Sequence, residues 1–307
     1  MRIGVLTGGG DCAGLNPALK WVVKTAMDER LEWERDGQYF HYLTKWMHAL
    51  DQVARMTGQP RFNLWARELA KTAFDAFIYL PSPVGPRRMV WKMSIDLTRA
   101  LVPAMGQHDP LDGYLTCLEL RATAAGRHES DTEPQLDNEI SQFAAMLEDV
   151  ELATADTLGI GGLLSDAYRA DDLIRQGVMT DEALLENLLA SALKGLQHYA
   201  GSGELRLPAE YRLAFREFGL AIGLRATQYL WQACDNDSPR RGASPKVRAL
   251  LKALSQYFTW SGEIESFWRD PAQQRTDRWS EHRDINEVML ATTLAPEGFL
   301  IKMILDR

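Results

Sequence analysis

The sequence predicts a mainly α-helical protein, preceded by a short β-strand, a glycine turn and a helix. From residue 38 onward, apolar residues recur every three or four positions in one stretch after another, which is typical of amphipathic helices. Short polar or Gly/Pro-containing breaks separate these stretches, so consecutive helices are expected to run antiparallel. A series of such hairpins can stack as a solenoid or close into an α/α toroid.

The first long helix is expected over Tyr39–Thr57. Its apolar and polar side chains separate onto two faces, and we assign the apolar face to the core. That face carries Leu43, Trp46, Met47, Leu50 and Val53, and the opposite face carries Lys45, His48, Asp51 and Gln52.

The remaining elements follow from the same periodicity. The stretch Thr57-Gly-Gln-Pro60 ends the first helix, and a return helix is expected over Phe62–Tyr79. Residues 81–86 contain three prolines and a glycine and form a loop, after which Arg88–Ile95 has the character of an extended segment. Further helices are expected at about 110–125, 136–149, 158–176, 181–200, 209–233, 245–259 and 284–294.

The start of the chain has a different character. The apolar run Met1–Thr7 is followed at once by Gly8-Gly-Gly-Asp-Cys-Ala-Gly14 and then by a helix-like stretch, Asn16–Met27. A strand, a glycine turn and a helix N-terminus together point backbone N–H groups at an anion. The alternative is that the glycines merely turn the chain.

The string Arg-Ile-Gly-Val-Leu-Thr-Gly-Gly-Gly-Asp-Cys-Ala-Gly-Leu-Asn resembles the start of phosphofructokinases, both ATP-dependent and pyrophosphate-dependent. The resemblance implies that Gly9, Gly10 and Asp11 belong to a phosphate-binding turn. The family's later Gly-Gly-Asp-x-Ser, Thr-Ile-Asp-Asn-Asp and Met-Gly-Arg segments are missing from this sequence. Because phosphoryl transfer depends on positioning and charge neutralisation, we expect no 6-phosphofructokinase activity.

A second resemblance covers residues 36–307. The stretches Arg35–His48, Thr57–Pro60, Trp65–Arg67, Met105–Gly113 and Glu281–Glu287 resemble an uncharacterised branch of the six-hairpin glycosidase-like and sugar 2-epimerase-like superfamily. This resemblance implies an α/α toroid, incomplete because the expected long helices are fewer than a full ring needs. No linker separates the two segments, so we interpret the chain as a fusion of 1–34 and 35–307.

Composition excludes several classes of protein. A net charge of −8 and a pI near 5.4 argue against nucleic-acid and anionic-membrane partners. No apolar run has the length of a membrane span, and no signal peptide is expected. Cys12, Cys117 and Cys234 lack metal-ligand spacing and indicate a reducing compartment. We expect a soluble, cytoplasmic protein without a metal or another cofactor.

Three histidines are the candidate proton carriers. His41 lies in the first turn of its helix, His108 precedes a helix start, and His282 precedes another. Histidine suits general acid–base chemistry because its pKa lies near physiological pH. We expect His108 and His282 to face a common cavity at one rim of the toroid; a surface position is the alternative for His282.

Three aspartates next to these histidines are candidate substrate-binding residues. Asp109 and Asp112 follow His108, and Asp284 follows His282. Helix capping is the competing explanation, because Asp109 precedes a proline and the pair Asp284 and Glu287 has the spacing of a capping box.

The candidate list is completed by a charged pair and two aromatic residues. Arg212 and Glu217 adjoin an apolar helical stretch, where a charge must be paired or functional. We include them as catalytic candidates, with a structural ion pair as the alternative. Trp46 and Trp91 could stack on a sugar ring or belong to the core.

The sequence as a whole favours a carbohydrate-active protein that performs acid–base chemistry on a sugar, as an epimerase, an isomerase or a glycosidase-like enzyme. Two alternatives stay open: a phosphofructokinase-family fragment that keeps only a phosphate-binding turn, and a catalytically inert helical scaffold. A toroid that lacks hairpins would expose apolar flanks, so self-association is also expected.

Overall fold

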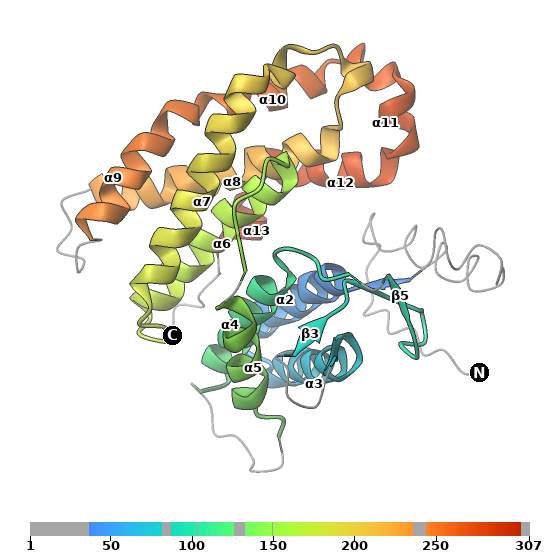
Figure 1. Cartoon of the computed structure of the whole chain (residues 1–307), viewed down its shortest axis with the longest axis vertical. Coiled ribbons are helices and arrows are strands. Elements are labelled where there is room, and N and C mark those ends of the chain that lie inside the picture. Colours follow the sequence, from blue (N-terminus) through green and yellow to red (C-terminus); the bar gives the residue numbers. More distant parts are fainter. Residues whose placement is uncertain are drawn as a thin grey trace.

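The computed structural model confirms a mainly helical protein (Figure 1). The strand, glycine turn and helix expected at the start, including Gly9, Gly10 and Asp11, lie outside the residues that the structure describes. The described residues are 37–81, 87–102, 104–125, 133–148, 150–235 and 244–301.

The first group of helices comprises α2 (Phe40–Thr57), α3 (Pro60–Phe77), α4 (Asp109–Ala125) and α5 (Asp137–Leu147). The helices α2 and α3 pack side by side as a hairpin, α4 packs on both, and α5 packs on α4. Gly58 makes the turn between α2 and α3, with a φ of 67° that suits glycine.

Two small antiparallel sheets cover one end of this group. The strands β1 (Gln38–Tyr39), β4 (Lys92–Met93) and β5 (Ala100–Val102) form one sheet in the order β1-β4-β5. Gln38 is paired with Met93, and Lys92 with Val102. The other sheet pairs β2 (Ile78–Tyr79) with β3 (Arg88–Met89).

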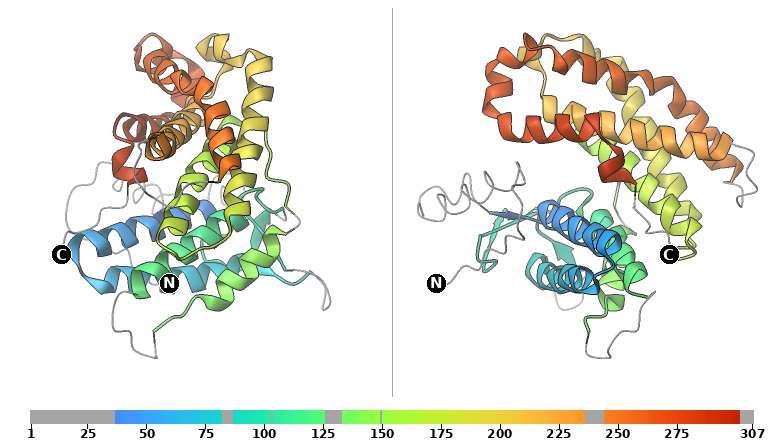
Figure 2. Two further views of the ribbon diagram at one scale, coloured as in Figure 1. Left: turned by 90° about the vertical axis from the view of Figure 1, so that its left-hand side faces the viewer. Right: turned by 180° about the vertical axis from the view of Figure 1, so that it is seen from behind.

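The second group is built around the long helix α8. It contains α6, α7 and every later helix, and Figure 2 shows α6 and α7 reaching down to the first group. Its elements are α6 (Thr157–Arg175), α7 (Glu182–Ser202), η1 (Glu204–Arg206), η2 (Ala209–Tyr211), α8 (Ala214–Asp235), α9 (Pro245–Leu254), η3 (Ser255–Tyr257), α10 (Thr259–Arg269), η4 (Gln273–Arg275), α11 (Asp277–Glu281), α12 (Arg283–Leu294) and α13 (Glu297–Leu300).

Helices α6 and α8 approach each other closely because glycines line the contact. A Cβ atom on Gly161 would overlap the backbone of Gly219, and one on Gly223 would overlap the backbone of Gly161. Helix α8 also packs against α9, α10 and α12. The second group is therefore organised around one central, largely buried helix.

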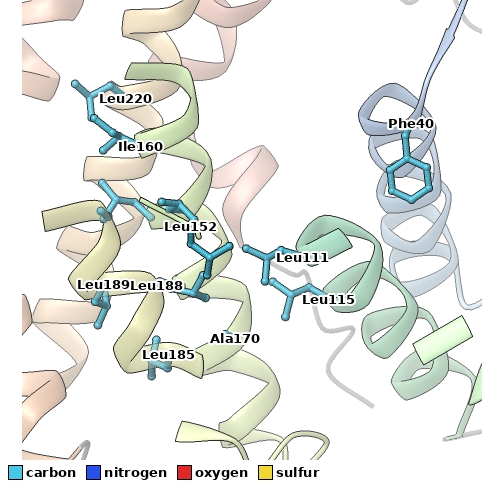
Figure 3. Packing of buried hydrophobic residues seen from close by; sticks show 14 of the residues in the cluster. Phe40, Leu111, Leu115, Leu152, Ile160, Ala170, Leu185, Leu188, Leu189 and Leu220 are labelled. Atoms are coloured by element: carbon cyan, nitrogen blue, oxygen red, sulfur yellow. The ribbon is translucent and has the colours of Figure 1, made fainter. Parts of the chain in front are cut away.

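One hydrophobic core joins the two groups. Leu111 and Leu115 of α4 point toward the leucines of α6 and α7, among them Leu188 (Figure 3). Both α4 leucines are fully buried, so the start of α4 is one of the places where the groups meet. No described helix is long and apolar enough to cross a lipid bilayer.

The structure corrects one helix face and adds the helices α10, α11 and α13 to the sequence prediction. Helix α2 buries Phe40, Thr44, Met47, Asp51 and Ala54, whereas Trp46 and Val53, assigned to the core, are exposed. Helix α10, with the buried Trp268, was not predicted. The predicted helical content is confirmed, but the closure of the hairpins into a toroid is not established.

Candidate functional site

A polar cluster lies where α2, α4 and α6 meet. We call it the α2–α4–α6 cluster, and its members are charged or hydroxyl side chains close to an otherwise apolar core. They are Thr44, Lys45 and His48 of α2, Asp109, Asp112, Thr116 and Glu119 of α4, and Asp166 and Arg169 of α6.

Arg169 is the centre of this cluster. Its guanidinium donates to Asp112 at 2.7 Å, to Asp166 at 2.9 Å and to both carboxylate oxygens of Glu119 at 3.1 and 3.0 Å. It also donates to the Thr116 hydroxyl at 2.8 Å. Burial disfavours its charge, but the three carboxylates outweigh burial and raise the pKa of Arg169 well above its usual value. One cation thus holds three acidic side chains.

Asp112 is the most strongly paired carboxylate of the cluster. Burial alone would raise its pKa, but Lys45, Arg169 and a hydrogen bond from the Thr44 hydroxyl together hold that pKa well below its usual range. The Lys45 ammonium lies 3.3 Å from Asp112 Oδ2. Asp112 therefore remains a carboxylate at any physiological pH.

Asp109, one helical turn before Asp112, has the opposite character. Its side chain is buried, and its Oδ2 atom has no hydrogen-bond partner among the described residues. Burial, followed by repulsion from Asp112, raises the pKa of Asp109 to about 7, although Lys45 opposes the shift. Two neighbouring carboxyl groups with pKa values pushed apart are the arrangement that lets one exchange protons while the other stays charged.

A narrow pocket opens beside Asp112 and Arg169. It lies between α2, α4, α6 and α13 and is partly open to solvent. Lys45 and His48 line it on the α2 side, and Phe299 of α13 covers it. His48 Nε2 lies 3.2 Å from the Phe299 carbonyl oxygen, and burial lowers the pKa of His48, with Glu119 acting in the opposite direction.

The candidate His41 lies within electrostatic reach of Asp112 and Lys45 in this cluster. It is on α2, one turn before Lys45, and its ring contacts Tyr42 and Tyr39 with centroid separations of 4.4 and 5.7 Å. Burial lowers the pKa of His41, while Asp112 acts in the opposite direction, so its imidazole is neutral at pH 7. Trp91 packs on Tyr39 at 5.3 Å and thus belongs to the same aromatic group.

Arg212 and Glu217 form a separate, fully paired cluster in the second group of helices. The guanidinium donates two hydrogen bonds to Glu217, at 2.8 and 2.6 Å, and the Trp268 indole N–H donates to the same carboxylate at 2.7 Å. The guanidinium also lies 3.8 Å from the centre of the Phe267 ring. This geometry agrees with the structural alternative for the pair.

His282 and Asp284 lie at the same end of the second group. The His282 ring packs against Phe215 at 5.2 Å, and Asp284 is exposed. The expected capping box is absent from the start of α12, because Glu287 accepts a hydrogen bond from Arg283 at 2.7 Å.

The last two candidates are His108 and Trp46. His108 Nε2 is 2.8 Å from the Leu152 carbonyl oxygen, so this histidine joins the segment before α4 to the segment before α6. Trp46 is on the outer face of α2. The candidates that the structure brings together are therefore His41, Asp109 and Asp112.

The sequence pattern alone does not mark Lys45, Glu119, Asp166 and Arg169 as site residues. A signal for Glu119 is present, because Asp112, Thr116 and Glu119 recur at helical spacing among the buried leucines of α4. Within the described residues, no group of His, Cys, Asp and Glu side chains is arranged to hold a metal ion.

Comparisons with known proteins support only the first resemblance. No family model matches the chain, and no solved structure matches it significantly. The ATP-dependent 6-phosphofructokinase of Buchnera aphidicola subsp. Acyrthosiphon pisum is 38% identical over 76 residues, which are 25% of this chain and 23% of that protein. The pyrophosphate–fructose 6-phosphate 1-phosphotransferase of Dictyoglomus thermophilum is 71% identical over 28 residues, 9% and 8% of the two chains.

The chain therefore spans less than a quarter of the length of the curated relatives that it matches. These matches confirm a phosphofructokinase-like segment. They do not extend to the helical sugar-epimerase-like superfamily, and none of them covers most of either chain.

Proposed function

We propose that the α2–α4–α6 cluster is an acid–base site for a sugar or a similar polyhydroxylated ligand. The observation that carries this proposal is the pair of carboxyl groups, Asp109 and Asp112, which differ in partners and in the direction of their pKa shifts. Asp109 exchanges a proton near neutral pH because its pKa is about 7 and no described residue forms a hydrogen bond with its Oδ2 atom.

The neighbouring side chains have complementary roles in this proposal. Asp112, held by Lys45 and Arg169, is the fixed negative charge. His41, neutral at pH 7, is the second proton carrier, and the aromatic group around Tyr39 offers flat apolar surface to a sugar ring.

The wider assignment rests on sequence resemblance. We propose that 35–307 is an incomplete α/α toroid related to sugar 2-epimerases and six-hairpin glycosidase-like proteins, joined to the segment 1–34. The free thiols of Cys117 and Cys234 fit a reducing, cytoplasmic location. His108, His282, Arg212, Glu217, Asp284 and Trp46 stay predictions outside this site.

Proton exchange with solvent provides a direct test of the site. The full-length protein is incubated in D₂O with free aldohexoses, ketohexoses and N-acetylhexosamines, and deuterium incorporation into the sugar carbons is followed by NMR. Nitrophenyl glycosides test hydrolysis in parallel. We expect turnover in one of these assays, and we expect Asp109→Asn to reduce the rate at least 100-fold because the proton-transferring group is lost.

The matched control is Asp137→Asn, which changes an aspartate in the first turn of α5 with an exposed side chain paired to Arg121. It should retain the wild-type rate. A folded wild-type protein that neither exchanges deuterium nor cleaves a glycoside would contradict the proposal and favour an inert scaffold.

A second candidate function is phosphate binding by residues 1–34, favoured by the 71% identity over 28 residues. In this proposal the segment binds a phosphate through Gly9, Gly10 and Asp11 and does not transfer it. We expect no fructose 1,6-bisphosphate from fructose 6-phosphate with ATP or with pyrophosphate, since the family's later catalytic segments are missing. A coupled aldolase assay measures this, and product formation above the enzyme-free rate would disprove the expectation.

A further inference from the structure

The outer face of α2 carries a continuous apolar stripe, which we call the α2 seam. It consists of Tyr42, Trp46, Ala49, Val53 and Met56, all exposed. Their separations of four, three, four and three residues follow the heptad repeat of a helix that packs against another helix. Tyr42, Trp46 and Met56 each leave about half of their surface in solvent, at 50%, 48% and 49%.

The seam lies opposite the face by which α2 joins the core. Successive residues of a helix are rotated by about 100°, so the seam is centred on the far side from Phe40, Met47 and Ala54, which are buried. A surface helix normally has polar side chains at that position. Helix α2 is therefore apolar on two opposite sides.

Several polar residues of α2 occupy the flank between these two sides. Lys45 contacts Asp112, His48 contacts the Phe299 carbonyl, and Gln52 donates to the Ile301 carbonyl at 3.2 Å. These contacts hold the flank against α4 and α13, so the seam keeps its outward orientation.

Residue sizes along the seam complement those of an inverted copy. When two such helices run antiparallel around a two-fold axis between positions 47 and 48, Trp46 faces Ala49 of the other copy, and Tyr42 faces Val53. The two aromatic side chains of the seam then each meet a smaller one, which favours interlocking packing, and Met56 faces position 39 at the edge of the interface. The seam contains no charged residue, so this arrangement brings no like charges together.

We propose that the α2 seam is the interface of a symmetric, antiparallel dimer of this chain. The same surface is used by both copies, as in most two-fold homodimers. From the exposed fractions and an area of roughly 150–250 Å² for an aromatic side chain, the seam offers roughly 400 Å² per copy. Two seams together approach the small end of protein interfaces, so the dimer is weak and depends on concentration.

Sedimentation velocity of the full-length protein between about 1 and 200 μM tests this proposal. We expect the wild type to shift from monomer to dimer across this range, with a dissociation constant in the micromolar range, as is typical of a small interface. Ala49→Glu places a charge at the centre of the seam and should keep the protein monomeric at 200 μM. Ala291→Glu, the same change at an exposed position of α12, should leave dimerisation intact.

Each alternative occupant of the seam gives a different result. A wild type that is monomeric throughout the concentration range overturns the proposal. In that case, a lower melting temperature of Ala49→Glu than of the wild type shows that another part of the same chain covers the seam. An unchanged melting temperature shows that the seam is exposed to solvent. Dimerisation that persists in Ala49→Glu, or that is lost in Ala291→Glu, assigns the interface to another face and also overturns it.

The direction of the two helices is tested by cysteine cross-linking. A Trp46→Cys chain is mixed with an Ala49→Cys chain that carries a tag of different mass, and both are oxidised. The antiparallel dimer produces the mixed cross-link. Cross-links confined to identical chains would indicate a parallel arrangement and contradict the proposed one.

Discussion

Replacing Arg169 with methionine is expected to lower the free energy of unfolding by roughly 3–5 kcal/mol, the range observed when one partner of a buried charge pair is removed. Methionine keeps most of the volume but leaves Asp112, Asp166 and Glu119 without the cation that holds all three. Urea unfolding at pH 7, followed by circular dichroism, measures the change.

The control lies on the same helix. Arg175 is 38% exposed and pairs with Asp171 and Asp172, so Arg175→Met should cost less than about 1 kcal/mol. A third variant, Arg169→Lys, keeps the charge but not the forked geometry of the guanidinium. Its decrease in unfolding free energy should lie between those of Arg175→Met and Arg169→Met. Equal losses for Arg169→Met and Arg175→Met would contradict the central role of Arg169.

The pH dependence of the Arg169→Met loss provides an independent check. Without the cation, Asp112 loses a main cause of its low pKa, and this carboxyl can become neutral as the pH falls. Protonation relieves the repulsion among the three acids. We therefore expect the destabilisation by Arg169→Met to be smaller at pH 5 than at pH 8.

Local sequence pattern was sufficient to predict most of the helices. The predicted 158–176 and 284–294 differ from α6 and α12 by one residue at most, because an apolar stripe of period 3.6 is a local property. Helix α10 was not predicted: its first turn contains Ser261 and Gly262, which are weak helix formers, and packing of Trp268 and Ile264 stabilises it instead.

The buried face of α2 could not be predicted from periodicity alone. The helix has two apolar sides, and the pattern contains no information on which one meets the core. Asp51 is buried because Arg55 and Asn63 each bond its carboxylate at 2.8 Å, and Thr123 donates to it at 3.0 Å. Arg55 is one turn away on α2, but Asn63 and Thr123 come from α3 and α4, and only the tertiary structure brings these two to the buried charge.

The site was predictable only in part, for the same reason. Asp109 and Asp112 were identified by their place beside a histidine and a proline at a helix start. Arg169 could not be identified in this way, because its partners Asp112 and Glu119 lie 57 and 50 positions away in the sequence. A buried ion pair between neighbours in sequence, such as Arg212 and Glu217, is easier to predict.

Replacing Asp109 with asparagine is expected to make the protein more stable at pH 8 and to leave its stability at pH 4 nearly unchanged. The pKa of Asp109 is about 7 in the folded protein and 3.8 without the fold, so between these values the folded state binds more protons than the unfolded one. The resulting contribution to stability is complete below about pH 4 and is lost as the pH rises through about 7. The asparagine side chain does not titrate in this pH range, so its contribution to stability does not change with pH.

A shift of about three pKa units corresponds to an upper bound on the order of 4 kcal/mol, so a gain of about 2–4 kcal/mol at pH 8 is expected for Asp109→Asn. Thermal unfolding from pH 4 to pH 8 measures it, with Asp137→Asn as the exposed control whose profile should follow the wild type. A constant difference between Asp109→Asn and the wild type would show that Asp109 does not titrate in this range. A gain in stability together with a loss of proton exchange is the expected signature of a side chain retained for function at a cost in stability.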